Sequence, residues 1–250
     1  PAGIQAALTA HAKGHHVTLL EKTETLGGLL HVACKPPHKE AFEHLRQYME
    51  HAVKQSGMDV RLGVEADVEM IRELNPDMTI VATGSEPVVP SFCRDSGAVT
   101  AQEVLMGRKT GQRVLILGGG LVGCETAEML AAQGKEVTIL ELRDTLAPDM
   151  EKRTRIFMMA RLKELGVKAL LNTEVLEVSG LHVRVRNALR TEHSLDEFDS
   201  LIMAFGYRSR STLHLQLADA GLSVTAVGDC VRPGKVITAV RQGFLAVSSL

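Results

Sequence analysis

The sequence is short of aromatic residues and of clustered cysteines. It holds no Trp and only two Tyr among 250 residues, which argues against aromatic platforms that stack bases or sugars. The four cysteines are Cys34, Cys93, Cys124 and Cys230. They form no CxxC pair and no cluster, so the sequence indicates neither a zinc site nor a local redox dithiol nor an iron–sulfur centre. No apolar run approaches the roughly 18 residues of a membrane span, and no signal peptide is visible.

The charge balance is close to neutral. A formal net charge of −2 gives no reason to expect attraction to nucleic acid or to a membrane surface. Hydrophobic residues make up 45% of the chain and charged residues 23%, which is ordinary for a globular protein with a real core. Scattered cysteines fit a reducing compartment, so we expect a cytoplasmic protein of one or two domains that binds no metal.

A glycine-rich turn joins a β-type run to a helix-type run. Residues 113–117, RVLIL, form a continuous apolar run that predicts a short buried strand. The following 121–133 is rich in Ala, Glu, Leu and Met and predicts a helix, with Gly134 as its C-terminal stop. VTILE at 137–141 predicts a second strand. The whole stretch is therefore a βαβ unit.

The glycines of this turn, Gly118, Gly120 and Gly123, have GxGxxG spacing. The first permits a tight turn, the second lets the backbone approach a pyrophosphate, and the third lets the helix pack closely on the strand. The helix N-terminus then offers free N–H groups to phosphates. Glu141 stands 18 residues after Gly123, near the position of a carboxylate that binds a ribose. The alternative, a turn that binds nothing, is disfavoured by the ordered succession of strand, helix, strand and acid.

The chain repeats this unit. Residues 1–26 align without a gap on residues 121–146, a shift of 120 positions that is too long a match for a turn-level accident. The aligned pairs include Gly3 with Gly123, Ala7 with Ala127, Gly14 with Gly134 and Glu21 with Glu141. The sequence thus predicts two dinucleotide-binding units. A duplicate kept only for architecture is the alternative.

Each copy is also closed by a similar strand. Residues 78–87 and 200–209 are β-type runs that end in Ala-x-Gly, where glycine lets backbone pass close to a nucleotide. A third run, 223–247, predicts a strand, then Gly228 and Asp229, then a helix that begins near Lys235. Asp229 can accept from a sugar-like hydroxyl beside that helix start. Its alternative role is an Asx turn or helix cap.

These motifs together resemble the two-dinucleotide-binding-domain flavoproteins. Three stretches, EKTETLGGLLHVACKPPHKE, TAQEVLMG and AVGDCVRPGKVITAVRQGF, are more narrowly similar to the C-terminal half of 2,4-dienoyl-CoA reductase and related NADH:flavin oxidoreductases of the old yellow enzyme superfamily, such as enoate reductases and trimethylamine dehydrogenase. The resemblance spans nearly the whole chain. It implies that the first unit binds FAD, or ADP in the dehydrogenase, and that the second binds NAD(P)H.

The resemblance also assigns residues. For FAD it implies phosphate-loop, ribose, flavin-facing, adenine and pyrophosphate contacts from Gly3, Glu21, Lys22, Gly27, Gly28, Val64, Ala82, Thr83, Gly84, Gly228 and Asp229. For the nicotinamide dinucleotide it implies Gly118, Gly120, Gly123, Glu141 and Gly206. It implies no catalytic side chain, because a hydride passes from nicotinamide to flavin when the rings stack and the cofactors carry the chemistry.

The sequence departs from this family at its beginning. Pro1 falls inside the first phosphate loop, so the first unit has no counterpart of RVLILGGG. The missing piece would be the central strand of a parallel sheet, and its loss exposes strand edges and apolar faces. We therefore expect a fragment of a longer protein that holds FAD weakly or not at all. The family's N-terminal barrel, with its FMN, 4Fe-4S cluster and acid/base residues, is not in these 250 residues.

The predicted fold class is α/β, with two Rossmann-like dinucleotide-binding domains built on parallel sheets. The FAD domain is discontinuous, at 1–105 and 218–250, and lacks its first strand, whereas the NAD(P) domain covers 106–217. In segment 172–198 apolar and polar residues alternate, which predicts a β-meander or hairpin. Met158 and Met159 are expected in the core, and the histidines in solvent.

The predicted function is that of an NADH:flavin oxidoreductase, passing hydride from NAD(P)H to FAD and on to the N-terminal barrel module. Glu141 favours NADH because it would repel a 2′-phosphate, although Arg143 lies two residues on. Two alternatives stay open. One is a stand-alone NAD(P)H reductase subunit that feeds a separate acceptor, similar to the glutamate synthase small subunit. The other is a non-catalytic ADP- and NAD-binding module. Nothing in the sequence selects a final substrate or an oligomeric state.

Overall fold

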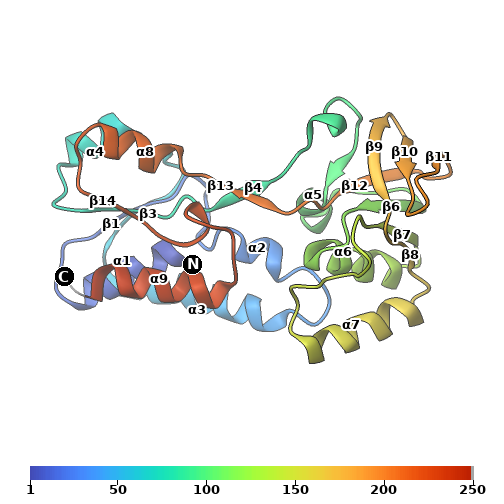
Figure 1. Ribbon diagram of the computed structural model, residues 1–250. Helices are drawn as coiled ribbons and strands as arrows, with labels where there is room; N and C mark the ends of the chain where they lie inside the picture. Colours follow the sequence, from blue (N-terminus) through green and yellow to red (C-terminus); the bar gives the residue numbers. More distant parts are fainter. Residues whose placement is uncertain (249–250) are drawn as a thin grey trace. The chain divides into compact units, whose positions relative to one another are not determined.

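The computed structural model describes residues 1–248, which form two compact units (Figure 1). Unit 1 comprises Pro1–Cys34, Lys39–Glu86 and the chain from Tyr207 onward, and unit 2 comprises Lys35–His38 and Pro87–Gly206. These boundaries differ from those expected at 105/106 and 217/218.

Strand pairing explains the shift of the boundaries. Strand β5 (Val99–Thr100) pairs in parallel with β12 (Ser200–Met203), which keeps the segment before residue 106 in unit 2. Strand β13 (Tyr207–Ser209) pairs with β4 (Ser85–Pro87), and α8 (Thr212–Asp219) packs near β14 (Val224–Ala226), which keeps residues 207–217 in unit 1. A two-residue strand carries too little pattern to be recognised in the sequence.

Unit 2 is built on one five-stranded parallel sheet with the strand order β5-β12-β6-β7-β8. Its remaining strands are β6 (Arg113–Leu117), β7 (Glu136–Leu140) and β8 (Lys168–Leu170). Central β6 has helices on one face and a second, antiparallel sheet on the other, so Val114–Leu117 are fully buried. Val114 and Ile116 pack with the helices, whereas Leu115 and Leu117 pack with the antiparallel sheet. Burial on both faces explains the continuous apolar run.

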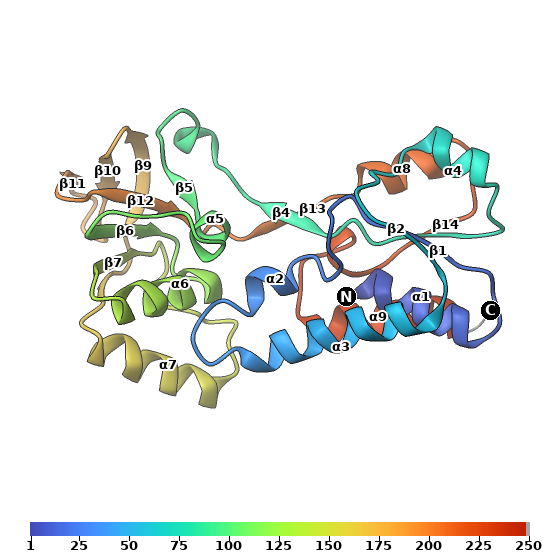
Figure 2. The same cartoon turned by 180° about the vertical axis from the view of Figure 1, so that it is seen from behind.

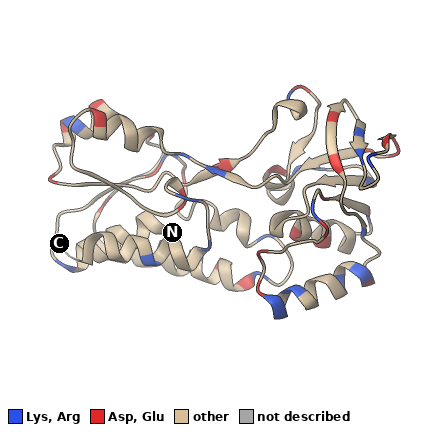
Figure 3. Ribbon diagram, in the orientation of Figure 1, with Lys and Arg blue, Asp and Glu red and all other residues tan. Residues whose placement is uncertain are grey.

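Three helices cover the first face of this sheet: α5 (Ala101–Leu105), α6 (Leu121–Ala132) and α7 (Lys152–Glu164). Helix α5 begins with a capping box between Thr100 and Glu103. Met158 is buried against the core, as expected, while Met159 is partly buried against it. Figure 3 shows that Lys and Arg residues are spread along α7.

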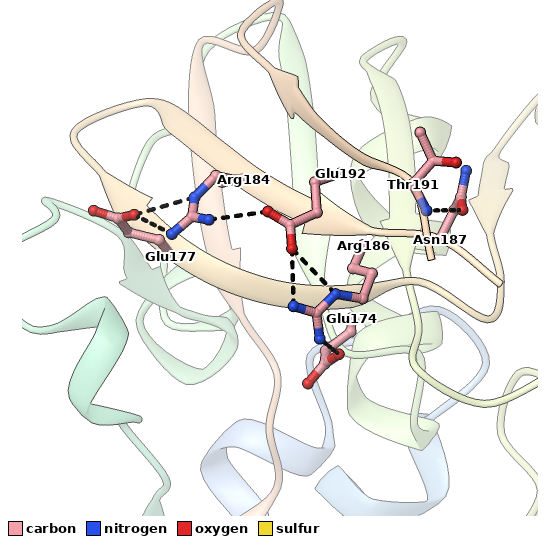
Figure 4. A network of polar contacts seen from close by, with 7 residues as sticks. All are labelled: Glu174, Glu177, Arg184, Arg186, Asn187, Thr191 and Glu192. Atoms are coloured by element: carbon pink, nitrogen blue, oxygen red, sulfur yellow. Dashed lines mark hydrogen bonds and ion pairs between the residues drawn. The ribbon is translucent and has the colours of Figure 1, made fainter. Parts of the chain in front are cut away.

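The antiparallel sheet is the meander expected at 172–198. It consists of β9 (Glu174–Ser179), β10 (His182–Arg186) and β11 (Glu192–Leu195). Val183 and Val185 of β10 are fully buried, and Arg184 and Arg186 alternate with them on the outer face. Both arginines bridge to glutamates of the neighbouring strands (Figure 4). Alternation places the apolar side chains on the core face.

Unit 1 has two short parallel ladders in place of one sheet. Strand β1 (Thr18–Leu20) pairs with β2 (Asp59–Arg61), and β3 (Thr79–Val81) pairs with β14. In the described part of the chain no strand joins the two ladders, as the sequence predicts. Apart from buried Val81, every residue of these four strands keeps some solvent exposure.

The helices of unit 1 are α1 (Ala2–Ala12), α2 (Leu30–Ala33), α3 (Glu40–Ser56), α4 (Val68–Leu74), α8 and α9 (Val236–Ser248). Figure 1 shows α4 and α8 on one side of the strands of unit 1 and α1, α3 and α9 on the other. Helices α1 and α9 lie side by side in both views (Figures 1 and 2). A Cβ on Gly243 of α9 would lie 2.2 Å from the carbonyl oxygen of Ala2. Only glycine permits this approach. Among the described residues, no helix is long and apolar enough to cross a membrane.

Candidate functional site

The turn between β6 and α6 needs glycine at two positions for packing reasons. Gly118 has φ +108°, and a Cβ there would lie 2.5 Å from the carbonyl oxygen of Ala204. A Cβ on Gly123 would lie 2.0 Å from the carbonyl oxygen of Gly118. Both positions therefore exclude every other residue.

Gly120 is different, because packing does not require it. It is the N-cap of α6, has φ −68°, and a Cβ there would meet no atom within 4 Å. No side-chain hydrogen bond caps α6 at Gly120. The first N–H groups of an α-helix have no partner within the helix. Uncapped donors and a positive helix end suit a phosphate group. The geometry fits a pyrophosphate at this turn.

Glu141 lies directly after β7 and is 6% exposed. Its Oε2 accepts a hydrogen bond from the Gly119 backbone N–H at 2.7 Å. Its Oε1 accepts from the backbone N–H of Arg143 at 2.9 Å and from the Arg143 Nε at 3.1 Å. The carboxylate therefore braces the glycine turn as well as standing at the predicted ribose position.

Unit 2 brings two further residues to this edge. Gly206 has φ +89°, and a Cβ there would meet no atom within 4 Å. Thr173 is 5% exposed, and its backbone N–H donates to the Glu141 carbonyl oxygen at 3.0 Å. The sequence reasoning missed Thr173, although the equivalent contact in unit 1 involves the predicted Val64.

Unit 1 repeats the helix–strand contact. A Cβ on Gly3 would lie 3.0 Å from the Ala82 Cβ, and a Cβ on Gly123 would lie 3.3 Å from the Ala204 Cβ. Pro1 is the N-cap of α1, which also has no side-chain cap. The structure therefore brings predicted residues Gly3 and Ala82 together at a helix start.

Gly228 and Asp229 join this helix start. A Cβ on Gly228 would lie 2.7 Å from the Ala2 Cβ. Asp229 accepts from the Ser85 hydroxyl at 3.2 Å and from the Gly234 backbone N–H at 3.2 Å.

Glu21 lies at the end of β1, and its Oε1 accepts from the backbone N–H and the hydroxyl of Thr23, both at 2.8 Å. The Val64 backbone N–H donates to the Glu21 carbonyl oxygen at 2.9 Å. Lys22 is nearly half exposed and forms an ion pair with Glu65 at 3.7 Å. The predicted ribose and adenine residues of unit 1 are therefore adjacent.

The remaining predicted residues of unit 1 lie in two glycine turns. The Thr83 hydroxyl donates to the Arg210 carbonyl oxygen at 2.5 Å, and the Gly84 carbonyl accepts from the Arg210 N–H at 2.9 Å. Gly27 and Gly28 have φ +120° and +53°. A Cβ on Gly27 would lie 2.9 Å from the Arg46 Cγ and 3.4 Å from the His31 Nε2.

His31 is a correction to the expectation that the histidines are solvated. Its Nε2 lies 2.9 Å from the Leu26 carbonyl oxygen, so His31 braces the Gly27–Gly28 turn. This contact is with a backbone carbonyl five residues earlier in the chain. No feature of the sequence distinguishes such a histidine from one on the surface.

The cysteines of the core are poor nucleophiles. Burial raises the pKa of the Cys124 thiol to about 12 and that of Cys93 to about 11. No disulfide links the four cysteines. Across residues 1–248, no group of three or more His, Cys, Asp or Glu side chains could hold a metal ion. The thiolate is the reactive form, so Cys93 and Cys124 fit structural roles.

The chain matches the protein family described as "Pyridine nucleotide-disulphide oxidoreductase" over residues 1–243. It is 39% identical over 254 residues to an NADH oxidase of Thermoanaerobacter brockii, covering 98% of this chain and 39% of that protein. It is 36% identical over 253 residues to a bilirubin reductase of Mediterraneibacter gnavus, covering 100% and 39%. The chain thus spans about two fifths of the length of these relatives.

Solved structures share the fold. A 2-naphthoyl-CoA reductase complex superposes with a TM-score of 0.91 at 26% identity, covering 98% of this chain and 37% of that chain. Histamine dehydrogenase from Rhizobium sp. 4-9 superposes with a TM-score of 0.86 at 20% identity, covering 100% and 42%. Two Rossmann-like domains on parallel sheets, predicted from the sequence, are confirmed.

Proposed function

Because this chain belongs to the pyridine nucleotide-disulphide oxidoreductase family, we propose that it passes hydride from NAD(P)H, bound in unit 2, to FAD, bound in unit 1. The family match and the reductases among the relatives support a flavin oxidoreductase. The observation that carries the assignment of the two sites is the repeated helix start, which lies against the alanine of a strand end in both units. When bound, the flavin and nicotinamide rings supply the redox chemistry.

In unit 2 we assign the phosphates to the α6 N-terminus. Gly118 and Gly123 hold the turn, and Gly120 leaves room for the pyrophosphate next to uncapped N–H groups. Glu141 faces the adenosine ribose, and Gly206 lies next to the nicotinamide half. These residues bind and orient the dinucleotide and transfer no proton.

In unit 1 we assign FAD to the start of α1. Gly3, Ala82, Thr83 and Gly84 lie along its pyrophosphate, with Gly228 and Asp229 next to its ribityl part. Glu21, Lys22 and Val64 bind its adenosine. Gly27 and Gly28 lie against the flavin, where Gly28 leaves open space for it.

We further propose NADH as the preferred donor, because the Glu141 carboxylate stands where a 2′-phosphate would be. We also propose that the electrons continue to an N-terminal barrel module with FMN and a 4Fe-4S cluster. The relatives support this, since the chain covers only about two fifths of their length. Scattered cysteines without disulfides suit a reducing cytoplasm, where we place the protein.

The test combines binding with electron transfer. NADH and FAD are titrated separately into the chain, and NADH-driven dye reduction is then followed with FAD present. Gly120→Ala keeps an allowed φ and meets no atom, so its melting temperature should match the wild type. Its NADH affinity should fall by about tenfold or more, because the methyl group occupies the pyrophosphate position.

Three outcomes separate the possible functions. Binding of both cofactors with dye reduction supports the proposal. Binding of ADP and NAD without dye reduction would identify a non-catalytic module. Unchanged NADH affinity in Gly120→Ala would contradict the assignment of the α6 turn.

A further inference from the structure

The carboxylate of Glu141 is engaged more fully than that of its repeat partner. Both of its oxygens accept hydrogen bonds, from Gly119 on one side and from Arg143 on the other. Within residues 1–248, hydrogen bonds reach only Oε1 of Glu21. A carboxylate has about four acceptor positions, so Glu141 has few left for a ribose.

Arg143 and Thr23 hold equivalent positions in the two units. Each donates its backbone N–H and a side-chain group to Oε1 of the preceding glutamate: the hydroxyl in Thr23 and Nε in Arg143. A neutral hydroxyl therefore suffices to brace this bend. The arginine adds a positive charge that the bend does not require.

The positive charge of Arg143 is compensated by neighbouring carboxylates. The guanidinium contacts the buried Glu141 carboxylate, and its Nη1 lies 4.0 Å from Asp149 Oδ2. About half of the Arg143 side chain is exposed, at the edge where Glu141 faces the ribose. Guanidinium groups are the usual partners of a ribose 2′-phosphate, which binds through charge-assisted hydrogen bonds.

We propose that Arg143 is a latent 2′-phosphate-binding residue that Glu141 neutralises, so that this pair, rather than Glu141 alone, selects NADH over NADPH. The inference rests on the proposed dinucleotide site of unit 2. Glu141 acts here as a positioning residue, because it holds Arg143 through Nε and removes its net charge. A 2′-phosphate would meet one guanidinium already shared between two carboxylates, whereas a 2′-hydroxyl needs no free positive charge.

The experiment is a double-mutant cycle on the 250-residue chain, with Glu141→Gln, Arg143→Thr and the double variant. Dissociation constants for NADH and NADPH are measured by nicotinamide fluorescence, which the absence of Trp keeps free of interference. Arg143→Thr copies the residue that unit 1 uses, so the bend keeps its hydroxyl bridge. Asp144→Asn is the matched control, because it removes a neighbouring charge from the same loop.

Glu141→Gln should raise the affinity ratio of NADPH to NADH by about tenfold, and the double variant should lose that gain. Loss of the Gly119 contact should weaken the binding of both dinucleotides equally, so this effect cancels in the affinity ratio. Arg143→Thr alone should leave the affinities for NADH and NADPH each within about threefold of the wild type, because Glu141 already neutralises Arg143 there. Asp144→Asn should leave the ratio unchanged.

Two results would overturn the inference. If Glu141→Gln changes the ratio equally with arginine or threonine at position 143, Glu141 acts alone. If NADPH affinity is the same in Glu141→Gln and in the double variant, Arg143 does not reach the 2′ position. A wild-type chain that binds neither dinucleotide would overturn the proposed function together with this inference.

Discussion

The repeated helix–strand segments of unit 1 and unit 2 share the hydrogen bonds at their helix ends but not the burial of their strands. Gly14 donates to the His11 carbonyl at 2.9 Å, and Gly134 donates to the Ala131 carbonyl at 2.9 Å. The next residue in each copy bonds five positions back at 3.2 Å. Yet β7 is buried from Val137 to Leu140, whereas β1 remains partly exposed along its length.

The difference lies in the neighbours of each strand. In unit 2, β6 separates β7 from β12 and completes the sheet. In unit 1, the equivalent ladders β1–β2 and β3–β14 remain apart. Backbone bonds at a helix end depend on residues a few positions away, whereas burial of a strand depends on segments that are distant in sequence. The two copies therefore separate what nearby residues determine, the helix-end hydrogen bonds, from what distant segments determine, the burial of the strand.

The largest loss of stability is expected at Gly118 of unit 2, where an added side chain would clash with the backbone. Gly118→Ala forces a side chain into φ +108° and against the Ala204 carbonyl. It should destabilise unit 2 by about 3 kcal/mol or more, measured as the free energy of unfolding in urea. Gly120→Ala is the control in the same turn. Equal stability of the two variants would mean that the Gly118 turn relaxes freely.

A smaller effect should be equal in the two copies. Gly14 and Gly134 end matching helices with φ +90° and +81°, and a Cβ at either position meets no atom. Replacing either with Ala should cost about 1 kcal/mol, because the strain is in the backbone alone. The unfolding free energies of Gly14→Ala and Gly134→Ala test this. A much larger cost in one copy would break the equivalence of the two helix ends.

The smallest effect concerns exposed acids paired with arginine. Arg46 lowers the pKa of Glu43 in unit 1 from 4.5 to about 2, and Arg113 lowers that of Asp199 in unit 2 from 3.8 to about 2. A depressed pKa contributes stability above the unfolded value, and that stability is lost as the pH falls toward 2. The Glu43 and Asp199 side chains are each 34% exposed, so solvent screens the contribution of both pairs.

The measurement is the melting temperature between pH 5 and pH 2. Glu43→Gln and Asp199→Asn should each reduce the dependence on pH in this window, by similar and small amounts. Glu65→Gln, an exposed acid paired with Lys22, is the control. An unchanged profile in both variants would show that neither pair contributes.

The sequence predicted the elements that depend on local pattern. The RVLIL strand, the helix up to Gly134 and the antiparallel meander all appear where they were expected. Gly118 and Gly123 have the turn and packing reasons given for them, and a Cβ on Gly120, predicted to leave room for a pyrophosphate, would meet no atom within 4 Å. Whether these residues bind the proposed dinucleotide stays a prediction.

The unit boundaries and the bracing contacts could not be predicted in the same way. Strand β5 has two residues and gains its identity only by pairing with β12, about 100 positions away. The bond from Gly119 to Glu141 spans 22 positions, and nothing in the composition of the turn indicates it. Thr173 was missed because its role comes from the carbonyl oxygen of Glu141.

The sequence alone determined that one supersecondary unit occurs twice, since side-chain size, periodicity and glycine placement act over a few residues and are copied with them. Only the tertiary structure decided that Glu141 accepts hydrogen bonds from Gly119 and Arg143, and that β5 pairs with β12. Contacts between distant segments depend on which strands become neighbours, and a repeated local pattern does not specify that.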